Sequence, residues 1–135
     1  MNGSPSAVGA DDVGKLVLRL ALGILILLHG MNKLMNGVSG IQDMLQGVGL
    51  PGQLAYAVYL GEVLGPILLI VGWYARVGAG LVVLNMLVAI GLVHRQELLH
   101  LNQHGGWALE LQGMYLFTAV ALVLLGPGRW SVNGR

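Results

Sequence analysis

Charged residues divide the chain into four apolar runs, and each run is long enough to cross a membrane as a helix. The runs are 18 to 21 residues long and comprise Leu16–Met35, Gln53–Trp73, Val77–His94 and Trp107–Gly126. About 20 helical residues cross a hydrocarbon core of about 30 Å, whereas a membrane strand needs about 10 residues that alternate polar with apolar. These runs do not alternate, so the sequence predicts an all-α integral membrane protein, a bundle of four transmembrane helices.

The composition excludes an ordinary soluble protein and a disordered one. Hydrophobic residues make up 56% of the chain and charged residues only 10%, whereas a soluble domain carries about 25% charged residues. The net charge of +1 provides no basic field for nucleic acid, so we expect membrane lipids and other membrane subunits as partners. The absence of cysteine excludes disulfides, thiol redox chemistry and cysteine-ligated iron–sulfur clusters in this chain.

The positions of the runs predict the domain organisation. Residues 1–15 are expected to form a flexible lead, residues 16–131 the transmembrane domain and residues 132–135 a short tail. The Gly-rich connection between the first two runs leaves room for a short interfacial helix over Ile41–Gln46. The next connection is a tight turn over Tyr74–Arg76, so the second and third helices are expected to form an antiparallel hairpin.

The distribution of basic residues predicts the orientation. Short loops rich in Lys and Arg stay in the cytoplasm. Five of the seven Lys and Arg residues lie on one side of the predicted bundle, namely Lys15, Arg19, Arg76, Arg129 and Arg135. Both termini and the tight turn are therefore expected to face the cytoplasm, and the two longer loops are expected to face outward.

A few polar side chains lie inside the predicted spans. An ionised group there costs about 2.5–3.5 kcal/mol on insertion scales, so it needs a partner or a function. At about 1.5 Å per residue, Glu62 and Asn85 lie about 13 Å below the outer boundary. Arg19 lies in the inner half, where its long side chain can snorkel to the interface. The six polar side chains of the outer half are His29, Lys33, Glu62, Asn85, His94 and Glu110.

Glu62 is the main candidate for chemistry because it lies near the midplane. His29 and Lys33 share one face of their helix at a spacing of i, i+4. One interpretation is a structural ion pair that joins Glu62 to Lys33 or His29. The other is proton transfer to a bound ligand, since a histidine beside a carboxylate can relay protons. Pro66 has no amide hydrogen, so the carbonyl of Glu62 loses its helical partner and a kink is expected there.

The remaining polar side chains of the spans have simpler interpretations. Asn85 is expected to form a hydrogen bond between helices, and Arg19 is also expected to be structural. The tyrosines are expected mainly to pack, although Tyr59 shares the face of Glu62 and is a candidate ligand contact. Glu110 lies at interfacial depth, where a solvated side chain and a site residue both agree with the sequence.

Histidines near the loop after the third run suggest two further kinds of site. His100 and His104 would share a face at i, i+4 if the loop were helical, with His94 nearby. No Asp, Glu or Cys completes a recognised metal-binding pattern, so a solvated loop is preferred and no metal site is predicted. A b-type haem needs two histidines at one depth, and His29 and His94 differ by about 9 Å.

Several short motifs follow one another along the chain in an order that resembles the DoxX family. The resemblance extends over about Leu16–Ser131, which is nearly all of the chain. The motifs are Leu18-Arg19 with Gly23, His29-Gly30 with Lys33, Gly49-Leu50-Pro51, Glu62, the hairpin from Gly72 to Arg76, Gly105-Gly106-Trp107 and the segment from Gly126 to Ser131.

The resemblance implies a small bacterial inner-membrane protein with four helices. The family takes its name from a subunit of a thiosulfate:quinone oxidoreductase. The positions that match the family's motifs are Arg19, His29, Gly30, Lys33 and Glu62. Because the chain has no cysteine, the resemblance does not support a thiol relay.

The predicted function is that of a membrane subunit linked to quinone redox metabolism, with a quinone as its ligand. His29 and Glu62 are expected to exchange protons in a pocket of the outer half. The expected ligand contacts are Lys33, Tyr59 and Glu110. Electrons would come from a partner subunit, and whether the chain is itself an enzyme stays open.

The alternative is a non-catalytic accessory subunit of a larger membrane complex. A small transporter is a third hypothesis, which no inverted repeat supports.

Overall fold

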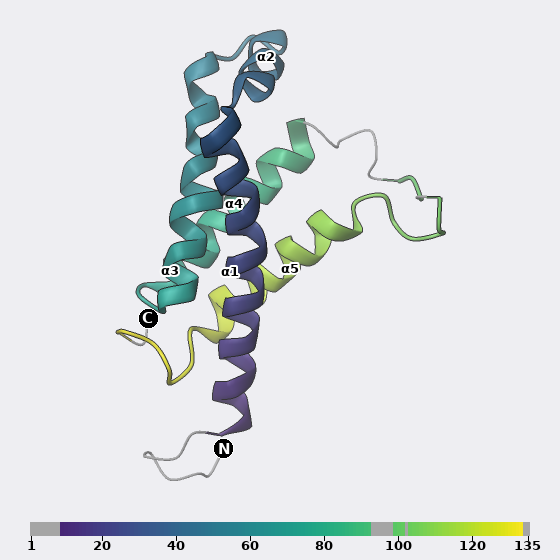
Figure 1. Ribbon diagram of the computed structural model, residues 1–135. Helices are drawn as coiled ribbons and strands as arrows, with labels where there is room; N and C mark the ends of the chain where they lie inside the picture. Colours follow the sequence, from purple (N-terminus) through teal and green to yellow (C-terminus); the bar gives the residue numbers. More distant parts are fainter. Residues whose placement is uncertain (1–8, 93–98, 102, 134–135) are drawn as a thin grey trace.

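The computed structural model describes residues 9–92, 99–101 and 103–133. Their regular structure is helical, apart from one isolated bridge between Leu101 and Trp107. The helices are α1 (Ala10–Asn36), α2 (Ser39–Gly47), the 3₁₀ helix η1 (Gly52–Ala57), the π-helical turn η2 (Leu60–Leu64), α3 (Gly65–Val71), α4 (Ala75–Leu92) and α5 (Glu110–Leu125) (Figure 1).

Three of these helical segments are long and apolar enough to cross a membrane, which confirms an all-α membrane protein. They are α1, the continuous stretch Gly52–Val71 that contains η1, η2 and α3, and α4. The fourth predicted span is a shorter apolar helix of 16 residues, α5. It begins at Glu110 instead of Trp107, because Trp107 is bridged to Leu101. It ends before Gly126, whose φ of 81° is accessible mainly to glycine.

The helices form a closed ring in which each packs on the next. The helix α1 packs against η2 and α3, these pack against α4, α4 packs against α5, and α5 returns to α1. The main core fills the centre of this ring and consists of Leu22, Ile26, Leu69, Ala75, Ala79, Val82, Met86, Ala119 and Leu122. The start of α1 and the segment after α5 lie at one end of the bundle, and α2 lies at the other (Figure 1).

The short helix expected over Ile41–Gln46 is present as α2, which packs against η1. Val38, Leu45 and Ala55 form a second, smaller core beneath it. This core fixes the connection that joins α1 to the second span. We refer below to the two ends of the bundle as the α2 end and the terminal end.

The tight turn lies slightly earlier than predicted, over Gly72–Tyr74 instead of Tyr74–Arg76. Gly72 ends α3 in the left-handed conformation at a φ of 78°, and Tyr74 follows at a φ of 46°. Glycine enters this region without steric cost, so Gly72 determines where the chain reverses. Arg76 consequently belongs to the first turn of α4.

The second span contains a π-helical turn where the sequence predicts a kink. The amide of Gly65 donates to the carbonyl of Leu60, a bond that spans five residues instead of four. Pro66 follows at the start of α3 and supplies no amide hydrogen. The wider turn absorbs one extra residue at this point, and Glu62 lies in its middle.

Candidate functional site

Glu62 joins three helical segments through its carboxylate. Its side chain is 7% exposed, and its Oε1 accepts a hydrogen bond from the ammonium of Lys33 on α1 at 2.5 Å. Its Oε2 accepts a hydrogen bond from the amide of Asn85 on α4 at 3.1 Å. Both carboxylate oxygens are therefore hydrogen-bonded, as a buried charge requires.

Two glycines bring the backbones close enough for these bonds to form. The Cα of Gly30 packs against the carbonyl oxygen of Glu62, and a methyl group on Gly30 would overlap that oxygen. A methyl group on Gly61 would overlap the side chain of Asn85 in the same way. Small residues allow membrane helices to approach closely. The lack of a side chain at Gly30 and Gly61 thus determines the position of Glu62 between α1 and α4.

Tyr59, directly before η2, bonds this arrangement to α1 and is not among the residues that line the cavity described below. Its hydroxyl donates to the backbone carbonyl of Lys33 at 3.0 Å. Its ring lies 6.4 Å from that of Tyr56. The sequence predicts a ligand contact at Tyr59; in the structure its hydroxyl bonds to the main chain of α1.

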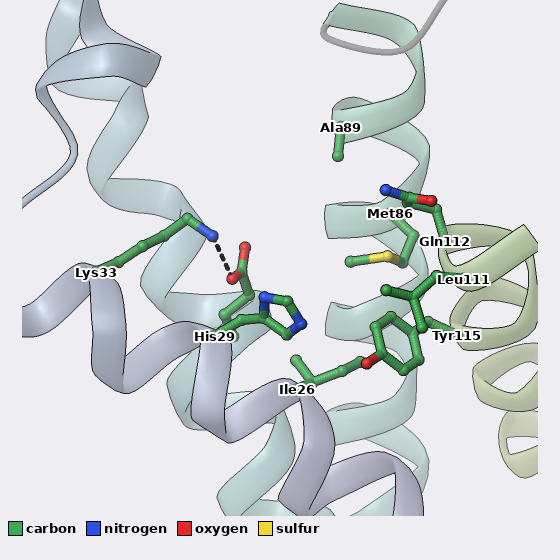
Figure 2. A pocket seen from close by; sticks show the side chains of 9 residues that line it. Ile26, His29, Lys33, Met86, Ala89, Leu111, Gln112 and Tyr115 are labelled. Carbon is green, nitrogen blue, oxygen red and sulfur yellow. Dashed lines mark hydrogen bonds and ion pairs between the residues drawn. The ribbon is translucent and has the colours of Figure 1, made fainter. Parts of the chain in front are cut away.

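A cavity of about 160 Å³ lies beside the ion pair, between α1, η2, α4 and α5. Figure 2 shows the side chains that line it. An apolar cavity of similar size, about 150 Å³, holds benzene in another protein. The cavity therefore has room for a single small ring. Its lining residues are Ile26, His29, Lys33, Glu62, Met86, Ala89, Leu111, Gln112 and Tyr115.

His29 and Tyr115 lie next to each other in the lining of this cavity (Figure 2). Their ring centroids are 6.0 Å apart and the planes are inclined at 77°, an edge-to-face arrangement. Within the described part of the chain, neither the imidazole nor the hydroxyl makes a hydrogen bond. The carboxylate of Glu62 is bonded to Lys33 and Asn85 and not to His29. His29 therefore lines the cavity without bonding to the carboxylate that the sequence suggests as its partner.

Glu110 and the loop histidines lie away from the cavity. Glu110 is exposed in the first turn of α5 and is absent from the cavity lining. His100 and His104 lie in non-helical chain on either side of Leu101, so the i, i+4 arrangement does not form. His94 lies outside the described residues. Among residues 9–92, 99–101 and 103–133, no group of three His, Cys, Asp or Glu side chains is suited to a metal ion.

The structure adds residues that the sequence did not indicate as site residues. Tyr115 and Gln112 line the cavity from α5, and Met86 lines it from α4. A spacing of i, i+3 places Gln112 and Tyr115 on one face and is a weak signal for a polar edge. Asn85 was expected to bond another helix, and the structure identifies its acceptor as the carboxylate of Glu62.

Arg19 forms a second buried polar site, near the terminal end. Its side chain does not snorkel as predicted, because the residue is only 1% exposed. The guanidinium donates to the carbonyls of Leu69 at 2.9 Å, Pro127 at 2.7 Å and Trp130 at 2.6 Å. A longer bond of 3.4 Å reaches the carbonyl of Ile70. The guanidinium thus joins α1 to the end of α3 and to the segment after α5, with main-chain acceptors only.

Comparison with known proteins gives two curated relatives of similar length. One is the Bacillus subtilis (strain 168) protein named "Putative oxidoreductase CatD", to which the chain is 29% identical over 115 residues. The aligned stretch covers 85% of this chain and 81% of the relative. The other is "Inner membrane protein YqjF" of Escherichia coli (strain K12), to which the chain is 28% identical over 124 residues. This aligned stretch covers 91% of this chain and 92% of the relative. No solved structure matches the chain significantly.

The match to the family model covers the polar site residues of α1, η2 and α4. The DoxX family model matches residues 14–95, which is more than half of the chain. Arg19, His29, Lys33, Glu62 and Asn85 all lie within this range. Together with the apolar helices and the inner-membrane relative, this match makes the protein a multi-pass protein of the bacterial inner membrane. The chain belongs to the DoxX family.

Proposed function

We propose that the chain is a membrane subunit linked to quinone redox metabolism and that the cavity binds the ring of a quinone-like ligand. The observation that carries this proposal is a ring-sized cavity, inside a membrane-spanning bundle, whose wall combines hydrogen-bond donors with apolar side chains. Small-molecule sites typically have this combination of a mostly apolar wall and a few polar groups.

The lining supports a flat ring that carries oxygen atoms. Ile26, Met86 and Leu111 offer apolar contacts for the faces of such a ring. The ammonium of Lys33 has three N–H groups, and among the described residues it makes one hydrogen bond, to Glu62. It can therefore donate to a ligand oxygen while it remains paired. The hydroxyl of Tyr115 provides a second donor on the opposite wall.

The exposure of His29 supports a lipid-soluble ligand. His29 lies within α1, yet its side chain is exposed. A polar group that faces hydrocarbon without a partner is costly. A ligand that enters from the bilayer and accepts or donates a hydrogen bond at the imidazole would remove this cost. Quinones with apolar tails are ligands of this chemical class.

In this proposal the quinone would accept electrons, and residues of the chain would bind it and exchange protons with it. A bound quinone supplies the acceptor of two electrons, and the electrons come from a partner redox subunit. Two protons balance this reduction. His29 and Tyr115 are positioned at the cavity to exchange protons with a ligand oxygen. Glu62 holds the ammonium of Lys33 at the cavity wall.

Binding of short-chain quinones to the full chain in lipid nanodiscs tests the proposal. We expect His29→Ala and Glu62→Gln to weaken binding by about tenfold or more, which is about 1.4 kcal/mol. The first variant removes a polar contact with the ligand, and the second removes the carboxylate that holds the ammonium of Lys33 at the cavity wall. Glu110→Gln is the matched control, since Glu110 lies outside the cavity, and its binding should equal that of the unsubstituted chain. Unchanged binding in folded His29→Ala and Glu62→Gln variants would contradict the proposal.

A non-catalytic accessory subunit is the second candidate, favoured by the shortness of α5. Its 16 residues extend about 24 Å, which is less than a hydrocarbon core of about 30 Å. A short apolar helix is accommodated by bilayer thinning or by association with other helices. Met114 and Phe117 lie on its outer surface, each 64% exposed. Purification from native membranes with a stable partner chain and no bound small molecule would favour this function over the first.

A further inference from the structure

The terminal end of the bundle is covered by the segment that follows α5. The amide of Val132 donates to the carbonyl of Gly72 at 2.9 Å, and the amide of Tyr74 donates to the side-chain oxygen of Asn133 at 3.0 Å. The amide of Arg129 donates to the carboxylate of Asp12 at 2.9 Å. The segment is thus bonded to α1 and to the hairpin turn, and it holds a fixed position across the helix ends.

Two cationic side chains flank this segment at Gly126 and Gly128. The guanidinium of Arg76 lies over Gly126, where a methyl group on the glycine would be 2.8 Å from one guanidinium nitrogen. The stem of Lys15 lies over Gly128, with its Cβ 3.1 Å and its Cδ 3.4 Å from such a methyl group. Two residues span at most about 7 Å. The guanidinium of Arg76 and the stem of Lys15 therefore lie against the same short stretch of chain.

No carboxylate neutralises these two cations within the described part of the chain. Neither Lys15 nor Arg76 takes part in an ion pair or hydrogen bond there. The carboxylate of Asp12, less than one helical turn before Lys15, accepts the amides of Gly9 and Arg129. Arg76 is exposed, and Lys15 is half-buried through its stem. Both charged groups are free to bind an anion from outside the chain.

Aromatic side chains place these cations at the level of the lipid headgroups. Trp73 and Trp130 lie at the same end and are 48% and 49% exposed. Tyr74 packs against Trp73 with ring centroids 4.9 Å apart. Tryptophan and tyrosine concentrate at the membrane–water interface. The anion that is abundant at this depth is the phosphate of a phospholipid.

We propose that Lys15 and Arg76 form a binding site for the phosphate of an anionic phospholipid. The guanidinium donates to the phosphate oxygens in a forked arrangement, and the ammonium contributes a second charge from the other side of Gly126–Gly128. The acyl chains lie along the apolar outer surface of the bundle. This site is at the terminal end and is independent of the cavity and of the proposed quinone.

The test compares the thermal stability of the full chain in nanodiscs of phosphatidylglycerol and of phosphatidylcholine, together with the lipid that it retains in native mass spectrometry. The unsubstituted chain is expected to be more stable in phosphatidylglycerol and to retain it preferentially. Each cation is expected to contribute about fivefold to this preference. Lys15→Gln should therefore reduce it about fivefold, and Lys15→Gln with Arg76→Gln about twentyfold. Arg76→Lys keeps the charge and should retain most of the preference.

Three outcomes would overturn the proposal. One is equal retention of the two lipids by the unsubstituted chain. The second is a loss of stability by the double variant that is equal in both lipids, because a structural role of Arg76 at the end of α5 would not depend on the headgroup. The third is competition by soluble glycerol phosphate at the same concentration as the lipid, which would identify a site for free phosphate.

Discussion

The helix α1 carries two buried polar sites that hold a cation in different ways. Arg19 donates to main-chain carbonyls of α3 and of the segment after α5, whereas Lys33 donates to the carboxylate of Glu62 beside a cavity. Main-chain acceptors are fixed by the fold, so the Arg19 site fastens the helices. Side-chain partners can rotate, so the Lys33 site can exchange one partner for a ligand. The difference separates a structural charge from one that is available for function.

The largest effect on stability is expected at Arg19. Replacement by leucine leaves the buried carbonyl oxygens of Leu69 and Pro127 without this donor, together with the partly buried carbonyl of Trp130. We expect a loss of about 3–5 kcal/mol in the free energy of unfolding. Arg19→Lys keeps the charge without the forked donors and should lose less. Unfolding of the purified variants in detergent, followed by circular dichroism, measures both. A loss below about 1 kcal/mol for Arg19→Leu would show that the Arg19 site does not fasten the bundle.

Gly30 provides the next largest effect, because it determines how closely α1 approaches Glu62. A methyl group in Gly30→Ala overlaps the carbonyl of Glu62 and lies 2.9 Å from Val63, so we expect a loss of about 2–3 kcal/mol. Gly80→Ala is the matched control, since nothing lies within 4 Å of the new methyl group. Alanine there should raise helix stability by up to about 1 kcal/mol. Equal unfolding midpoints of the two variants would argue against the close approach.

The ion pair is expected to show coupling between its partners. Lys33→Met or Glu62→Gln alone leaves one charge without its partner, and each should cost about 2 kcal/mol. The double variant removes both charges and should cost less than the sum by at least about 1 kcal/mol. A double-mutant cycle on unfolding measures this coupling. Additive losses would mean that the pair is no more coupled than two distant residues.

The smallest effect is expected at Asn85, which donates a single neutral hydrogen bond to Glu62. Asn85→Ala should cost about 1 kcal/mol, the usual size of a polar contact between membrane helices. Asn36→Ala is the control, because the hydrogen bond of Asn36 with Asn32 is exposed and should contribute almost nothing. If quinone binding is weakened more by Asn85→Ala than by Asn36→Ala, the amide also positions the carboxylate.

The architecture could be predicted from the sequence because lipid requires long apolar helices. The four runs, the hairpin and the short α2 all correspond to elements of the structure. The boundaries were less accurate where glycines decide them, at Gly72 and before Gly126. The snorkelling expected of Arg19 was wrong, because its acceptors come from residues such as Pro127 and Trp130 that are far away in the sequence.

The site could be predicted only in part. Depth along the helices placed Glu62 and Asn85 at one level, and the structure joins them. The rotation of α5 could not be predicted, because this helix is apolar on all sides and lipid does not select one face. Glu110 was consequently expected at the site, whereas Gln112 and Tyr115 line the cavity.

The π-helical turn at Leu60–Leu64 has a consequence for how the second span can change. An extra residue in a helix turns everything beyond it by about 100°, since an α-helix has 3.6 residues per turn. The helical segments before and after the turn are therefore rotated differently about the helix axis. The turn itself directs Glu62 towards Lys33 and Asn85, and the rotation of the part after it buries Leu68 and Leu69 in the bundle. A deletion of one residue within the turn would preserve the length of a membrane span but would give one continuous α-helix. The carboxylate of Glu62 and the core residues Leu68 and Leu69 could then no longer face inward together.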